Sequence, residues 1–220
     1  LFAHLPEKLK CGALNLPPGL SEMETAAEMH RLARADRPAG DGGPVCFLGA
    51  GAYDHFIPAA VDELTGRGEF YTAYTPYQPE ISQGALQAIY EYQTMIASLC
   101  GADVANAGLY DGATALAEAC AAAVAASRAG RKTVVLDGAI HPHYRRVAES
   151  LLTPRGIRVA VVSPPADSFV SATDELKKAA GGNDVAAVAV AYPNFYGALA
   201  SPADVFAAAR ANKAAAVACS

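Results

Sequence analysis

The chain has 220 residues, of which 52% are hydrophobic and 18% are charged, a balance typical of a compact protein with a sizeable core. The net charge is −5 and no basic cluster is present to meet phosphates, which argues against nucleic-acid binding. The longest apolar runs are too short to span a bilayer and no stretch resembles a signal peptide, so we expect a cytoplasmic protein without a membrane segment.

The cysteines and the two ends of the sequence give further expectations. The five cysteines are odd in number, widely spread and without a C-x-x-C pair, which predicts reduced, mostly buried thiols rather than a disulfide frame or a zinc site. The chain begins without methionine and ends on an apolar run at 214–220 that has the pattern of a buried strand. We therefore expect a piece of a longer protein, with the C-terminal part of the fold missing.

The first 56 residues predict an arm and one helix. Residues 1–20 contain Pro6, Pro17, Pro18 and Gly19 and are expected to be extended. Ser21 and Glu24 have the spacing of a capping box, which predicts a helix that ends near Asp36. Gly49 and Gly51 match part of a dinucleotide-binding fingerprint, but Asp54 replaces its third glycine, so a tight bend before a helix near Ile57 is favoured.

Residues 70–84 read FYTAYTPYQPEISQG and are rich in tyrosine. Pro76 and Pro79 fix their own φ and restrict the preceding residue, so we expect an extended backbone. Tyrosine carries an apolar ring with a polar tip, and such a segment either packs on its own chain or reaches into a partner. A helical apolar pattern follows over 84–100, and Gly101 is expected to end that helix.

Beyond residue 101 the pattern alternates between helix and strand. An alanine-rich helix is expected from Asp111 to about Ser127, and further helices near 143–152, 172–180 and 202–212. The expected strands are 133–136, 158–162, 185–191 and 214–218. Continuously apolar strands that alternate with helices predict an α/β domain with a mostly parallel sheet covered on both faces. We expect an N-terminal arm with interface helices over 1–100 and a partial large α/β domain over 101–220.

In such sheets, ligands bind beyond the carboxyl ends of the strands. The first candidate loop holds Asp111, Gly112, Ala113 and Thr114 at the start of the alanine-rich helix, where backbone N–H groups suit a phosphate. The Asp111 carboxylate has the opposite effect, because it would cap the helix itself and repel a phosphate. A self-capped helix and a phosphate cup therefore both remain open.

Two further loops offer candidate side chains. His141 follows an expected strand, where it would either stack on a flat cofactor ring or fill the strand–helix turn. Its neighbour His143 lacks a supporting carboxylate pattern, so we expect no metal site. Asn194, after the most apolar strand, would either meet a ligand oxygen or serve as ordinary turn chemistry.

Covalent catalysis has little support in the sequence. No G-x-S-x-G elbow occurs, and the cysteines have apolar neighbours, where thiols are usually inert. None of the lysines follows an expected strand in a small-residue loop, and Lys213 precedes its strand. We expect no catalytic residue in this chain.

Several long motifs resemble one known family, subunit 1 of the two-chain glycine cleavage system P-protein, a glycine dehydrogenase (decarboxylating). The motifs are LNLPPGLSE, GAGAYDHFIPAAVDEL, EFYTAYTPYQPEISQGALQAIYEYQTMIASLCG, ANAGLYDGATALAEA, VAVAYPNFYGAL and AAVACS. The resemblance covers nearly all of the chain and stops about halfway along the family's length.

The resemblance implies a large domain of the fold-type-I pyridoxal-phosphate kind. It also implies an oxidoreductase that decarboxylates glycine and passes the aminomethyl group to the lipoyl arm of H-protein. In the two-chain, heterotetrameric form the cofactor lysine belongs to subunit 2, and subunit 1 is its partner. The absence of a suitable lysine and the presence of Asp111 in the phosphate loop agree with this, so any cofactor contacts of the three candidate loops would be weak or vestigial.

The resemblance points to the tyrosine-rich segment as the part that reaches the partner. We expect Tyr74, Tyr77 and Gln78 to line the glycine pocket of subunit 2. Two alternatives stay open: an independent pyridoxal-phosphate enzyme, such as an aminotransferase, whose lysine lies beyond residue 220, and a nucleotide-binding α/β module.

Overall fold

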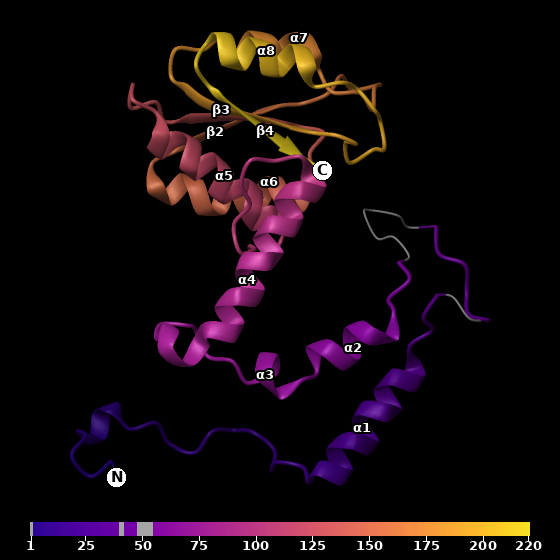
Figure 1. Cartoon of the computed structure of the whole chain (residues 1–220). Helices are drawn as coiled ribbons and strands as arrows, with labels where there is room; N and C mark the ends of the chain where they lie inside the picture. The colour runs from indigo at the N-terminus through magenta and orange to yellow at the C-terminus, as the bar shows by residue number, and fades with distance from the viewer. Residues whose placement is uncertain (1, 40–41, 48–54) are drawn as a thin grey trace. The chain divides into compact units, whose positions relative to one another are not determined.

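The computed structural model describes residues 2–39, 42–47 and 55–220 (Figure 1). The chain divides into two compact units, Leu1–Ala52 and Tyr53–Ser220. The division after residue 100 that we expected from the sequence stays a prediction. The glycine pair Gly49 and Gly51, with the nearby Asp54, lies outside the described residues.

The described part of the first unit is an arm with one long helix. A single 3₁₀ turn, η1 (Glu7–Leu9), interrupts the expected extended stretch. Helix α1 (Glu22–Ala35) has the predicted capping box: the Glu24 N–H donates to Ser21 Oγ at 3.3 Å, and the Ser21 N–H donates to Glu24 Oε2 at 2.9 Å. Neither element buries a side chain, although they carry leucines and methionines.

Three helices begin the second unit: α2 (Ala59–Thr65), α3 (Gly68–Tyr71) and α4 (Pro79–Cys100). The expectation that 70–84 is extended is wrong at both ends, because α3 takes in Phe70 and Tyr71 and α4 starts at Pro79. Proline is well suited to the first position of a helix, where its missing N–H needs no partner. The stretch 72–78 between the two helices is non-helical, and Ser82 interrupts α4 with non-helical backbone angles (φ −116°, ψ 15°).

The predicted α/β pattern is confirmed in the rest of the unit. Gly101 ends α4 in the left-handed conformation, as expected, with φ 62°. The strands and helices then alternate as β1 (Thr133–Asp137), β2 (Arg158–Val162), β3 (Val185–Ala191) and β4 (Ala215–Cys219), with α5 (Gly112–Ala126), α6 (Pro142–Leu152), η2 (Thr153–Arg155), α7 (Thr173–Ala180) and α8 (Ala203–Ala211).

The four strands form one parallel sheet in the order β2-β1-β3-β4. Helices α5 and α6 cover one face and α7 and α8 the other (Figure 1). Alternate residues of the central strands enter the two cores: Leu136 packs with Cys120 of α5 and Leu152 of α6, while Val135 packs with Leu176 of α7 and Val205 of α8. β1 and β3 are covered on both faces and every residue of both is buried, so β3 is apolar throughout and β1 is apolar between Thr133 and Asp137.

The expectation that most cysteines are buried is wrong. Cys120 is buried and Cys219 is partly buried, but the other three are exposed: Cys11, Cys46 and Cys100. These three lie in the first unit and at the end of α4. Their apolar neighbours in the sequence are not packed into a hydrophobic core there.

Candidate functional site

The carboxyl edge of the sheet has a switch point between β1 and β3. From β1 the chain crosses to β2 on one side, and β3 lies on the other side of β1. The loops that follow the two strands meet there, because the Phe195 N–H donates to the carbonyl of Ala139 at 2.8 Å. This is the position at which open α/β sheets commonly bind ligands.

A buried carboxylate anchors the loop after β1. Asp137, the last residue of β1, is fully buried. Its Oδ1 accepts the N–H of Ala139 at 2.9 Å, and its Oδ2 accepts the hydroxyl of Ser171. Gly138 comes next, and a Cβ there would lie 2.7 Å from the Cα of Ser163, so only glycine fits. Asp137 was assigned no role from the sequence, although an aspartate at the end of an apolar run is a signal that could have found it.

Asn194 is placed as a turn residue. It is 5% exposed, and its Nδ2 donates to the carbonyl of Phe169 at 2.8 Å. Its Oδ1 accepts the N–H groups of Tyr196 at 3.0 Å and Ala198 at 2.9 Å. Of the two roles that the sequence left open, these contacts are those of turn chemistry.

Asp111 caps α5 through a reciprocal pair of hydrogen bonds. Its Oδ1 accepts the N–H of Thr114 at 2.7 Å, and its own N–H donates to Thr114 Oγ1 at 3.1 Å. The Thr114 hydroxyl also lies within hydrogen-bond distance of the carboxylate, at 2.8 Å. The Thr114 backbone N–H, followed by its hydroxyl, holds the pKa of Asp111 below its ordinary value. Of the two roles left open, the contacts are those of a self-capped helix.

His141 caps α6 and lies in a cluster of rings. Its Nδ1 accepts the N–H of His143 at 3.1 Å. Its ring centroid lies 4.8 Å from that of Phe195 and 5.2 Å from that of Tyr144. Tyr144 also contacts the α5 turn, because a Cβ on Gly112 would lie 2.5 Å from the tyrosine Oη. The structure therefore brings the His141 loop, the Asn194 loop and the start of α5 together, and sequence reasoning missed both Tyr144 and Phe195.

These residues do not fit the phosphate and aldehyde groups of pyridoxal phosphate. The N–H of Thr114, a donor that a phosphate would use, is bound to Asp111. The lysines are described and lie away from this edge: Lys132 and Lys213 precede β1 and β4, and the others are on α7 and in the arm. Among the described residues, one phosphate donor of the α5 turn is therefore occupied by Asp111, and no lysine lies in the loops after the four strands.

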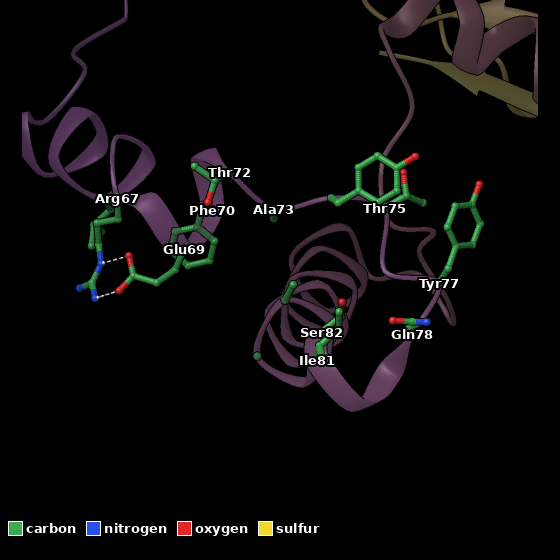
Figure 2. Close-up of a pocket in the computed structure, with 14 residues that line it drawn as sticks. Arg67, Glu69, Phe70, Thr72, Ala73, Thr75, Tyr77, Gln78, Ile81 and Ser82 are labelled. Carbon is green, nitrogen blue, oxygen red and sulfur yellow. Dashed lines mark hydrogen bonds and ion pairs between the residues drawn. The ribbon is translucent and has the colours of Figure 1, made fainter.

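A second candidate site is the groove formed by the end of α2, by α3, by residues 72–78 and by the start of α4 (Figure 2). Its volume is about 1020 Å³. Tyr74 and Tyr77 line it and are 82% and 78% exposed, with their ring centroids 6.5 Å apart. Gln78 precedes α4 and makes no capping bond with its side chain. All three residues predicted to reach a partner thus line the same open groove.

The groove carries one pair of opposite charges. Arg67 Nη2 lies 2.6 Å from Glu69 Oε1, and Figure 2 shows the pair on the α3 side of the groove. The side-chain hydrogen bond from Arg67 lowers the pKa of Glu69 to about 2, so the two charges balance over the neutral pH range. The other described residues that line the groove are uncharged.

The described residues contain no group of three His, Cys, Asp or Glu side chains that could hold a metal ion. Within the same residues, no helix combines the length and apolar character that crossing a bilayer requires.

Comparison with known proteins identifies the family. The family model for the glycine cleavage system P-protein matches residues 1–220. The probable glycine dehydrogenase (decarboxylating) subunit 1 of Syntrophomonas wolfei is 49% identical over 97% of this chain and 47% of its own length. The protein of the same name from Geotalea uraniireducens is 46% identical over 96% of this chain and 46% of its own length.

A solved structure agrees. The crystal structure of glycine decarboxylase (P-protein) of the glycine cleavage system, in inhibitor-bound form, matches 99% of this chain and 47% of its own chain, with a TM-score of 0.80 and 41% identity. The chain thus spans about half the length of the relatives it matches. The resemblance seen in the sequence is confirmed, and this chain belongs to the glycine cleavage system P-protein family.

Proposed function

We propose that this chain is part of subunit 1 of a two-chain glycine dehydrogenase (decarboxylating), and that it acts as the partner of a cofactor-bearing subunit 2. The observation that carries the proposal is the 46–49% identity to proteins named probable glycine dehydrogenase (decarboxylating) subunit 1. The placement of the lysines supports it: those of the described residues lie away from the carboxyl ends of β1 to β4, so the loops after these four strands offer no amine to a cofactor aldehyde. In this proposal pyridoxal phosphate is bound by subunit 2, where it acts as the electron sink for decarboxylation.

The partner role assigns a purpose to the tyrosine groove. Tyr74 and Tyr77 present large rings to solvent, and tyrosine is among the residues that contribute most to protein interfaces. In the proposed complex, these rings and the Gln78 amide contact subunit 2 near its glycine pocket. The remaining partners are those of the family reaction: glycine as substrate and the lipoyl arm of H-protein as acceptor of the aminomethyl group.

An assay of the two-chain enzyme tests this role. The Tyr74→Phe/Tyr77→Phe double variant keeps both rings and removes both hydroxyls, so it is expected to lower the rate of glycine–carbon dioxide exchange without abolishing pairing. Tyr110→Phe is the matched control, because Tyr110 is 95% exposed and does not line the groove. Exchange at the wild-type rate in the double variant would contradict the contribution of these hydroxyls to the glycine pocket.

The alternative of an independent pyridoxal-phosphate enzyme is tested by the same preparation. Such an enzyme would catalyse exchange without subunit 2, whereas the proposed partner subunit would not.

A further inference from the structure

The first turn of α5 is occupied by the side chain that precedes it. A helix of 15 residues normally offers its first N–H groups and a partial positive charge to an anion. Here the Asp111 carboxylate accepts the Thr114 N–H at 2.7 Å and lies 2.8 Å from the Thr114 hydroxyl oxygen. The donors that would select a phosphate are therefore bound to a carboxylate of the same chain.

A ring closes the same turn from the side of α6. The would-be Cβ of Gly112 lies 2.5 Å from Tyr144 Oη and 2.8 Å from Tyr144 Cζ. This phenol ring thus lies directly against the backbone at which a phosphate oxygen would approach. It is held in place by its contact with His141, whose ring in turn meets Phe195.

We propose that Asp111, with Tyr144 beside it, is a built-in closure of the α5 turn, so that the carboxyl edge of this sheet rejects phosphorylated ligands. The inference deepens the proposed function, on which it rests: it names the residue that keeps a phosphate-bearing cofactor out of this subunit. The closure has two components. The carboxylate occupies the donors, and its negative charge repels a phosphate dianion, which is consistent with an Asp111 pKa below its ordinary value.

Two substitutions separate occupation from charge. Asp111→Gly removes the side chain at a position where glycine is well tolerated before a helix, and leaves the Thr114 N–H without its partner. Asp111→Asn removes the charge but keeps an oxygen that accepts the same N–H. The test uses the chain in complex with its cofactor-loaded subunit 2, with inorganic phosphate as the probe. Hydrogen–deuterium exchange of the peptide that contains 112–114 is the local readout.

In the wild-type chain we expect slow exchange that phosphate does not change. In Asp111→Gly we expect severalfold faster exchange that excess phosphate slows again, since the ion then takes the free donors. In Asp111→Asn we expect slow exchange and a phosphate response smaller than that of Asp111→Gly, because the charge is removed while the donors stay occupied.

Three results would overturn the proposal: protection of the wild-type turn by phosphate, no phosphate response in the glycine variant, or a phosphate response in the asparagine variant equal to that of glycine. Failure of the wild-type chain to pair with subunit 2 is a different result. It would contradict the proposed function, and the same exchange comparison on the unpaired chain would still decide this proposal.

Discussion

Two parts of the second unit use their apolar residues in opposite ways. Between α5 and β4 the chain folds into three layers around a buried core, in which Leu176 of α7 is 0% exposed. Between α2 and α4 no helix buries a side chain, and Leu99 of α4 is 83% exposed. The first part is stabilised by its own core, whereas the second presents apolar surface that we assign to a partner.

The largest effect is expected from truncating a leucine in the buried part. Leu176→Ala leaves a cavity between α7 and the sheet and is expected to lower the free energy of unfolding by about 2–5 kcal/mol. The measurement is urea denaturation of the chain followed by circular dichroism.

Leu99→Ala is the matched control, because it removes the same atoms from an exposed site. We expect a change within about 0.5 kcal/mol. Equal losses in the two variants would show that α4 has a core of its own and would remove the contrast between the parts.

Alkaline pH should destabilise the buried part through Cys120. Burial, with a smaller effect from Cys219, raises the pKa of the Cys120 thiol from 9.0 to about 11. A group whose pKa is raised by folding contributes stability below its unfolded value and loses it as pH rises through its folded value. We therefore expect a loss of about 2–3 kcal/mol between pH 9 and 11, measured as the urea midpoint.

Cys120→Ala tests the assignment, since it lacks the titrating thiol and should show a flatter profile over the same pH range. A wild-type profile that matches the variant would contradict it. The exposed Cys100 offers a simple comparison, because a thiol reagent should modify it much faster than Cys120.

Loss of both groove tyrosines should weaken pairing but not folding. Tyr74→Ala/Tyr77→Ala removes two exposed rings, and we expect affinity for subunit 2 to fall by about 30-fold, the equivalent of ~2 kcal/mol. Isothermal titration calorimetry measures the affinity, and the urea midpoint of the chain should stay unchanged. A drop in the midpoint with unchanged affinity would mean that the tyrosines pack on their own chain.

The smallest effect is expected from the ion pair beside the groove. Arg67→Gln removes an exposed partner of Glu69 and should leave the urea midpoint unchanged, because exposed pairs add little stability. The pKa of Glu69, now held at about 2, should return toward its ordinary value, which an NMR titration records. An unchanged pKa would show that the pair does not form in solution.

The fold was easier to predict from the sequence in the buried part, from α5 to β4, than in the exposed part, from α2 to α4. The strands and α5–α8 were predicted within one or two residues, because buried parallel strands are continuously apolar and alternate with helices. The α3–α4 region was predicted less well. Pro79 restricts the residue before it to an extended conformation, and proline is also suited to the first position of a helix. The helical pattern of residues 80–100 is what makes Pro79 the start of α4.

The candidate site was predictable in its parts but not in its arrangement. The local sequence was enough to propose that Asp111 caps α5, because the cap and its partner Thr114 are three residues apart. Tyr144 was missed because its contact with Gly112 joins two helices far apart in the sequence. The burial of Cys100 was misjudged for the related reason that apolar neighbours along a helix do not show whether a second layer covers them.

The most direct test of the partner role is to find where the cofactor binds. The chain and subunit 2 are purified separately and together in the presence of pyridoxal phosphate, dialysed, and examined for cofactor absorbance. We predict that this chain alone is colourless, that the complex is coloured, and that borohydride reduction fixes the cofactor to a lysine of subunit 2 only. Stable colour in this chain alone would contradict the account.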